Sequence, residues 1–181
     1  MRVVWMLVFC LAPWTAPPAA ADEADDFFEV GLGYLKSGFY REARAAFAES
    51  LVRAPGEAVP TAFTALACAA EGRDTRSCAY LVRLAYKRLP AKRNFQVDWN
   101  KVLGGKSNRA RIEKAFQVRL KDTKGSARID TLVVLAFLQI HDGPKAKSPA
   151  LAMLRKEKPD DALVVALTPP KAKKKKAPSP S

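Results

Sequence analysis

The stretch FFEVGLGYLKSGFYREARAAFAESLVRAP, residues 27–55, decides the expected fold. Apolar and small residues recur in it at intervals of three and four, which is the spacing of one face of an α-helix. The pair Ser37-Gly38 interrupts the pattern and Pro55-Gly56 ends it, as expected where helices stop. The stretch therefore predicts two antiparallel helices joined by a short turn, the first over residues 24–37.

Small and apolar positions of this stretch are expected to form the contact between the two helices: Phe27, Val30, Gly31, Tyr34, Ala43, Phe47 and Pro55. Gly31 and Ala43 let the helices approach closely, and the aromatic residues would fill the seam around that contact. The spacing resembles the tetratricopeptide repeat, with Phe27 in place of the usual tryptophan and Val30 in place of leucine. The resemblance implies a helical-hairpin module that binds other proteins, and not an enzyme.

A second hairpin is expected to begin near Pro60, with its turn at residues 71–74. The positions that match the first hairpin are Phe63, Leu66, Ala67, Cys78, Val82 and Pro90. Pro90 follows Pro55 by 35 residues, close to the tetratricopeptide period of about 34. The period therefore supports two consecutive repeats.

The rest of the chain predicts helices with less regular spacing. We expect a linker with a short helical turn over residues 94–105, a helix from 107 or 108 to 121, a hairpin over 127–140 and 148–155, and a short helix at 160–167. A buried strand is the alternative at 131–140, because its Val133-Val134 pair favours strands. The expected class is all-α, with antiparallel hairpins stacked as a short α-solenoid over residues 22–167. The Lys, Pro and Ser residues of 168–181 predict a disordered tail.

The first 21 residues are typical of a secretory signal peptide. Arg2 precedes an apolar run over residues 3–11, and Ala19-Ala20-Ala21 provides small residues before the acidic Asp22. Cleavage after Ala21 would make the protein secreted or periplasmic. The alternative is a membrane anchor by the uncleaved signal, for which the apolar run is shorter than the roughly 20 residues that span a bilayer.

The formal net charge is +13, and it is unevenly distributed. Carboxylates open the chain after the leader, at Asp22, Glu23, Asp25, Asp26 and Glu29. Between residues 83 and 121, twelve Lys and Arg residues stand against only Asp98 and Glu113. An acidic start and a basic middle predict a dipolar surface that attracts anionic partners.

The tetratricopeptide resemblance implies a concave binding face, lined by the first helix of each hairpin. Apolar and small residues expected on it are Leu32, Gly33, Ala65, Cys68 and Ala69. The charged residues expected to bind the partner are Asp26, Glu29, Lys36, Arg109, Arg111, Lys114, Arg119 and Lys121. The expected partner is an unidentified protein or peptide that is acidic where it meets the cations. A stack this short could also be completed by a second copy of the chain.

The alternative function is electrostatic binding of a polyanion, which could be anionic lipid, a cell-wall polymer or nucleic acid. The basic middle and the lysines of the tail, Lys171 and residues 173–176, would provide the charge. Phe95 and Trp99 lie among lysines and arginines, as in surfaces that stack on single-stranded bases. The simpler interpretation of these two aromatic residues is that they belong to the core.

After leader removal the chain keeps two cysteines, Cys68 and Cys78. In the repeat register they lie on facing helices, so they either form a disulfide or remain two buried thiols. A disulfide would close a loop of about 10 residues and add about 2–3 kcal/mol of stability in the chain-entropy estimate.

The residues offer little for catalysis. His141 is the only histidine, which leaves a histidine metal cluster or a Ser-His-Asp triad without its parts. Gly104-Gly105-Lys106-Ser107 resembles the end of a phosphate-binding loop, but Asn100 stands where the first glycine is required. We therefore expect a non-catalytic protein without metal or cofactor.

Overall fold

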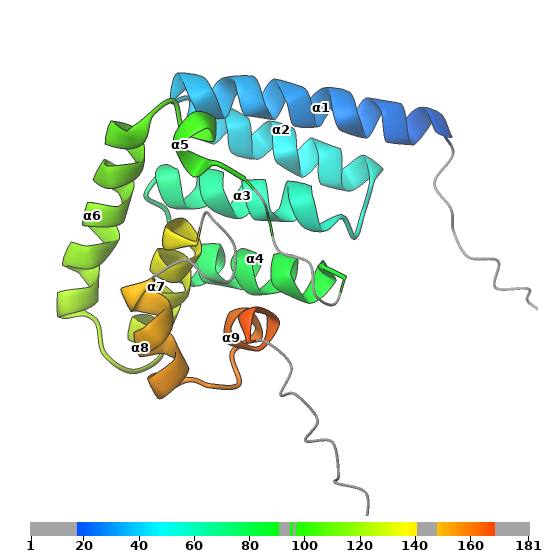
Figure 1. The fold of residues 1–181 in the computed structure, drawn as a ribbon. Coiled ribbons are helices and arrows are strands. Elements are labelled where there is room, and N and C mark those ends of the chain that lie inside the picture. The colour runs from blue at the N-terminus through cyan, green and yellow to red at the C-terminus, as the bar shows by residue number, and fades with distance from the viewer. Residues whose placement is uncertain (1–17, 91–94, 96, 141–147, 169–181) are drawn as a thin grey trace, which may run out of the picture.

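The computed structural model describes residues 18–90, 95, 97–140 and 148–168, with side chains from residue 21 onward. The predicted leader up to residue 17, residue 141 and the tail from residue 169 therefore lie outside the described residues. Within the described ranges the chain forms nine α-helices and no strand (Figure 1): α1 Pro18–Ser37, α2 Tyr40–Arg53, α3 Ala58–Ala70, α4 Thr75–Arg88, α5 Trp99–Val102, α6 Lys106–Asp122, α7 Gly125–Gln139, α8 Pro149–Glu157 and α9 Ala162–Leu167.

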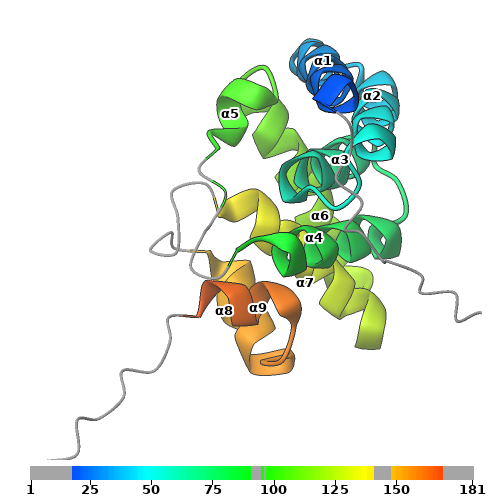
Figure 2. The ribbon, with the colours of Figure 1, turned by 90° about the vertical axis from the view of Figure 1, so that its right-hand side faces the viewer.

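The helices form stacked hairpins, which confirms the all-α prediction. The α1–α2 hairpin packs through α2 on the α3–α4 hairpin, and α4 packs on α7 (Figure 1). Helices α8 and α9 close the far end of the stack, opposite α1 (Figure 2). Among the described residues, no helix combines the length and the apolar character needed to cross a membrane.

Close approach of α1 and α2 depends on Gly31. A Cβ atom at this position would lie 2.6 Å from Cδ1 and 3.0 Å from Cζ of Phe47, so a larger residue would collide with the ring. The Phe47 ring in turn contacts Phe28 and Phe63, with centroids 5.4 and 5.6 Å away. Gly31 therefore makes room for the aromatic cluster that joins the first two hairpins.

The predicted packing face of α1 is wrong at two positions. Val30 and Tyr34 are 51% and 41% exposed, and Phe27 is half-buried under the Arg53 guanidinium, 4.2 Å from its ring centroid. The buried stripe instead joins Ala24, Gly31 and Leu35 with the half-buried Phe28. Both stripes have helical spacing, so the period alone leaves the choice open. Helix α2 decides it, because its Phe47 ring lies against Gly31.

The remaining positions of the two-hairpin pattern fall in two groups. Pro55 and Pro90 lie in exposed segments beyond the ends of α2 and α4, where a residue without a backbone N–H is tolerated. The interior positions are buried: Ala43, Phe47, Phe63, Leu66, Ala67, Cys78 and Val82.

Helices α5, α6 and α7 run back along the stack of α1 to α4, from α1 at one end to α4 at the other. Trp99 of α5 is 1% exposed and packs its ring on Phe63 and Phe137, at 5.7 and 5.2 Å between centroids. Its Nε1–H also donates a hydrogen bond to the Phe137 carbonyl, at 3.3 Å. Gly104 follows in the left-handed region with φ +73°, and a Cβ there would collide with the Lys36 carbonyl at the end of α1. The segment that the sequence presents as a linker is therefore a core element joining α1, α3 and α7.

Residues 125–139 form helix α7, so the strand alternative for that region is wrong. A partly buried ion-pair network holds α9 in place. Arg83 of α4 donates hydrogen bonds of 2.7 Å to both Asp130 of α7 and Asp161. Burial alone would lower the pKa of Arg83, and the hydrogen bonds to Asp130 and Asp161 outweigh it and raise that pKa. Asp161 also caps α9 by accepting from the Leu163 amide. One carboxylate thus holds the last helix in two ways.

Candidate functional site: a basic edge formed by three helices

Of the two alternatives for the cysteines, the structure has the disulfide. Cys68 of α3 and Cys78 of α4 are joined with their Cα atoms 5.7 Å apart, and both residues are buried. The bond crosses the second hairpin and encloses the turn between its helices. Its role is to hold α3 against α4, and its burial keeps the sulfur atoms away from solvent.

We expect the Cys68→Ala/Cys78→Ala variant to lose about 2–3 kcal/mol of unfolding free energy, because the unfolded chain regains the loop entropy that the disulfide removes. Urea titration followed by circular dichroism measures the change. Reductant should lower the stability of the wild type toward that of the variant and leave the variant unchanged. Equal stability of variant and oxidised wild type would contradict the prediction.

The expected concave face is closed at α3. Residues 61–69 of this helix are all buried, and nine consecutive residues cover every side of a helix. The prediction that Ala65, Cys68 and Ala69 line an open binding face is therefore wrong. The reason is that α3 packs between α2 and α4 while Trp99 reaches its Phe63 side chain. The exposed Asp26, Glu29 and Lys36 remain on α1, away from any groove along α3.

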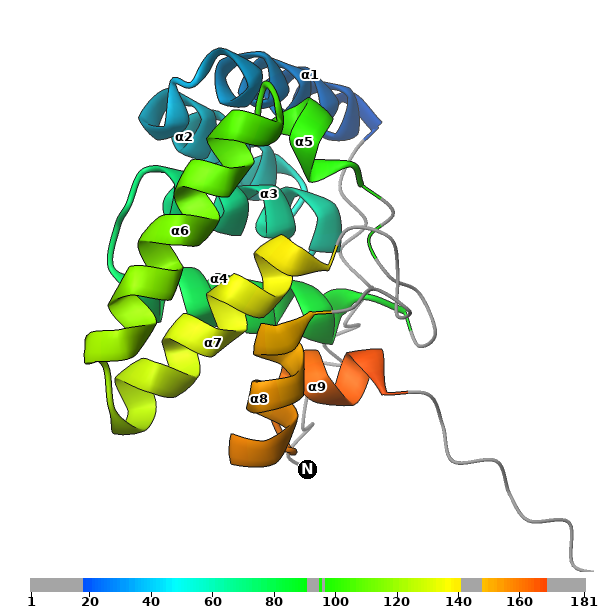
Figure 3. The ribbon, with the colours of Figure 1, turned by 60° about the vertical axis from the view of Figure 1, so that its left-hand side comes forward.

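Helix α6 lies across the starts of α2 and α4 (Figure 3). At its first half, Arg111 Nη2 donates to the Tyr40 hydroxyl at 3.3 Å, at the start of α2. Toward its end, Arg119 Nη1 donates to the Thr75 hydroxyl and to the Arg73 carbonyl, at the start of α4. These contacts bring cations from separate helices onto one edge of the molecule.

Arg109 does not belong to this surface. It is 8% exposed, and its Nε donates a 2.7 Å hydrogen bond to Glu113, one helical turn later. The prediction that Arg109 binds a partner is wrong, because its charge is already compensated inside the fold.

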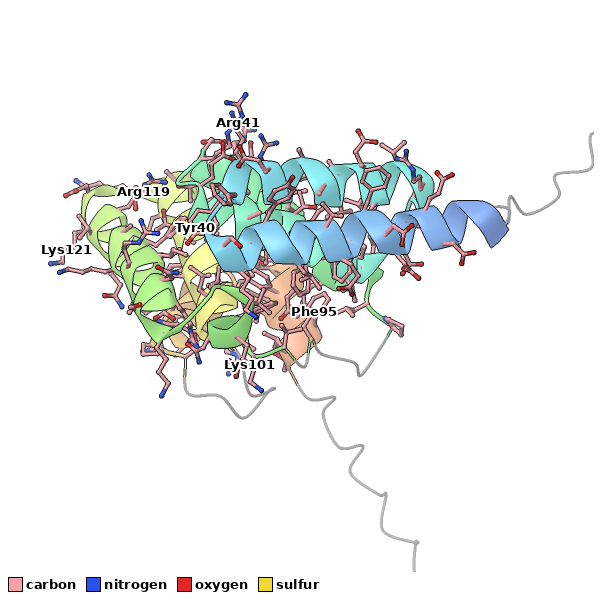
Figure 4. All side chains as sticks on the ribbon, turned by 90° about the horizontal axis from the view of Figure 1, so that it is seen from above. Tyr40, Arg41, Phe95, Lys101, Arg119 and Lys121 are labelled. Carbon is pink, nitrogen blue, oxygen red and sulfur yellow. A yellow bond between two sulfur atoms is a disulfide. The ribbon has the colours of Figure 1, made fainter. Side chains whose placement is uncertain are left out.

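The basic edge consists of exposed cations on α2, α4 and α6: Arg41, Arg76, Arg111, Lys114, Arg119 and Lys121. Figure 4 shows the labelled Arg41, Arg119 and Lys121 at the same end of the molecule. Within the described ranges, none of the six forms a salt bridge with a carboxylate. Such a cluster raises the local positive potential, since no carboxylate within the described ranges forms an ion pair with its members.

Sequence reasoning found four of these six cations and missed Arg41 and Arg76. Both lie in the first turn of the second helix of a hairpin, whereas the expected site was on the first helices and on the helix that ends at residue 121. The available signal was their equivalent place after the two turns, at 38–39 and 71–74. Only the position of α6 shows that the starts of α2 and α4 belong to the same surface.

Apolar side chains are interleaved with the cations. Val118 is 53% exposed and lies one helical turn from both Lys114 and Lys121 on α6. On α4, Tyr80 is 62% exposed and lines a shallow hollow with Arg76, Ser77 and Leu81. The edge is therefore chemically mixed, with exposed apolar side chains about one helical turn away from the cations.

Phe95 and Trp99 contribute nothing to this surface. Both are buried, and Phe95 packs edge-on against Tyr86 with centroids 5.3 Å apart. Burial also raises the pKa of the Tyr86 phenol. The two aromatic residues belong to the core, so they form no stacking platform for nucleic-acid bases.

The part of the chain that the structure describes holds no group of three His, Cys, Asp or Glu residues placed to bind a metal ion. Gly105 precedes α6, and the helix α5 comes before it, where a phosphate-binding loop would follow a strand. Comparison of the chain with protein-family models, with curated proteins and with solved structures finds no match in any of the three.

Proposed function

We propose that this protein is a non-catalytic, tetratricopeptide-like interaction scaffold outside the cytoplasm, and that its basic edge binds an acidic segment of a partner protein. The observation that carries the proposal is the set of six exposed cations from α2, α4 and α6 without a salt-bridge partner among the described carboxylates. Four of the six are arginines, whose planar guanidinium groups suit paired hydrogen bonds to carboxylates.

The apolar neighbours favour a protein over a simple polyanion. A segment that alternates acidic and apolar residues could place carboxylates on Lys114 and Lys121 while an apolar side chain covers Val118. A polyphosphate or a nucleic-acid backbone has nothing to place on Val118 or Tyr80. The burial of Phe95 and Trp99 removes the specific feature that favoured single-stranded nucleic acid.

The tetratricopeptide-like assignment is supported by the two stacked hairpins and by the contact between Gly31 and Phe47. In the proposed scaffold, however, the partner does not enter a groove along the first helices, because α3 is covered. It binds across the starts of α2 and α4, where α6 adds its own cations. The site is thus built by the segment that follows the repeats.

The proposed compartment is supported by the leader pattern of residues 1–21 and by the Cys68–Cys78 disulfide, a bond typical of oxidising compartments. The predicted cleavage after Ala21 would leave a helix that starts at Asp22, with Glu23 and Asp25 in its first turn. Carboxylates at a helix N-terminus are favourable, because the helix dipole is positive there.

A crosslinking pulldown from the envelope fraction tests the proposal with three variants of the chain. We expect Lys114→Glu/Lys121→Glu to lower recovery of one or two partner proteins at least about tenfold, because it reverses two charges of the edge. The matched control is Lys87→Glu/Lys101→Glu, which makes the same change in net charge. These two exposed lysines lie outside the edge, at the end of α4 and on α5. The third variant lacks residues 171–181.

The control and the truncated chain should recover the same partners as the wild type. Equal losses with the edge variant and the control would contradict a specific edge and indicate general charge attraction. Diffuse recovery of anionic polymers that disappears with residues 171–181 and falls steeply with salt would support the polyanion alternative instead.

A further inference from the structure

The second half of α1 carries a glycine that the fold of one chain does not require. Gly33 is exposed, and a Cβ atom built on it meets nothing within 4 Å. Glycine inside a helix is destabilising relative to alanine, because the unfolded chain has more backbone freedom to lose. Gly31, two residues earlier, has an evident packing reason in Phe47, whereas Gly33 faces outward.

Exposed apolar side chains lie beside Gly33. Val30 and Tyr34 are exposed on the same side of α1, and Tyr34 packs edge-on against Phe39 with centroids 6.4 Å apart. Phe39 is itself exposed at the turn before α2. Together with Gly33, these residues form an exposed apolar strip, in which Gly33 contributes no side chain.

The charges of this strip change sign along the helix. The first part of α1 exposes carboxylates and its end exposes one lysine, Lys36: the carboxylates are Asp22, Asp25, Asp26 and Glu29. None of these five side chains forms a salt bridge with another described residue. If two α1 helices cross in antiparallel orientation, each acidic half meets the Lys36 end of the other helix, and Val30 of one copy meets Gly33 of the other.

We propose that a second copy of this chain binds here, and that the protein forms a two-fold symmetric dimer through the outer face of α1, defined by Asp26, Val30, Gly33, Tyr34 and Ser37. A two-fold interface must be complementary to itself, and an antiparallel crossing places the Lys36 of each copy beside the carboxylates of the other. Small residues at a helix crossing allow close contact of the two backbones. Since α1 ends the stack, a second copy can reach it without displacing another helix (Figure 1). The dimer would leave α6 free, so the inference does not depend on the function of the basic edge.

Sedimentation velocity tests the dimer. The full sequence is expressed, its N-terminus is determined by mass spectrometry, and the mass is measured from about 1 to about 100 μM, the range expected for one helix face per copy. We expect a reversible rise from monomer to dimer. Val30→Asp and Gly33→Arg should each raise the dissociation constant at least about tenfold, by placing charge or bulk in the crossing.

Val165→Asp is the matched control, because Val165 is exposed on α9 at the opposite end of the molecule (Figure 2). It should leave the dissociation constant unchanged. Gly33→Arg should keep the helical circular dichroism and leave the thermal midpoint of the monomer equal or slightly higher, since its side chain points into open space and arginine favours a helix more than glycine does. The proposal is overturned by a monomer throughout the concentration range, by a dimer that Val30→Asp leaves intact, or by a dimer that forms only when the leader is retained.

Discussion

Trp99→Ala is expected to lower the free energy of unfolding by about 3–5 kcal/mol, the usual effect of truncating a large buried aromatic residue. Trp99 is almost fully buried and touches Phe63 of the second hairpin and Phe137 of α7. Its removal opens a cavity between the first four helices and the segment that returns along them. Because domains of this size are stable by about 5–15 kcal/mol, one substitution would remove a large fraction of the total.

Denaturant titration followed by circular dichroism measures this loss. Trp99→Phe should cost less, because it keeps most of the ring contacts. Its remaining cost includes the lost hydrogen bond to the Phe137 carbonyl, which contributes about 1 kcal/mol. Tyr80→Ala is the control for an exposed aromatic residue and should change stability by less than about 0.5 kcal/mol. A Trp99→Ala variant as stable as Tyr80→Ala would mean that α5 is not part of the core.

The second large effect is expected at Asp161. Asp161→Ala removes a buried partner of Arg83 and the N-terminal cap of α9. Breaking a buried ion pair costs about 3–5 kcal/mol, but Arg83 keeps Asp130 and some contact with solvent. With the lost cap contributing about 1 kcal/mol, we expect a total of about 3 kcal/mol in urea unfolding.

Two neighbouring substitutions separate the causes. Asp161→Asn keeps an oxygen that can cap α9 and removes the charge, so the difference between the Asn and Ala variants measures the cap. Asp160→Ala removes an exposed aspartate whose ion pair is with the exposed Lys158. This substitution should leave the urea midpoint of unfolding unchanged. If Asp161→Ala behaves like Asp160→Ala, the network through Arg83 does not hold α9.

Local patterns predicted the helices well. The turns at 38–39 and 71–74 and the breaks near Pro55 and Pro90 delimit α1 to α4, because Gly and Pro end helices through their own backbone geometry. The same rules located α6, α8 and α9 to within a few residues. For α7 the pattern allowed two alternatives, since a short apolar run fits a buried strand as well as a buried helix.

The candidate site was predicted only in part. The density of cations over residues 83–121 pointed to α6, and Arg111, Lys114, Arg119 and Lys121 lie on the basic edge. Arg109 lies in the same cation-rich stretch of sequence, but it is buried and pairs with Glu113, because its side chain is on the side of α6 that faces the core. A charge count along the chain cannot tell these two situations apart.

The sequence by itself determined the helices, their ends and the pairing of neighbours into hairpins, because these depend on spacing and backbone preferences within a few residues. The tertiary structure alone decided which face of α1 is buried, that α3 is covered on every side, and that Arg41, Arg76 and the cations of α6 share one edge. These features depend on segments tens of residues apart. Their physical origin is the return of α5, α6 and α7, held by Trp99 and by the glycine at position 104, which no local period in the sequence encodes.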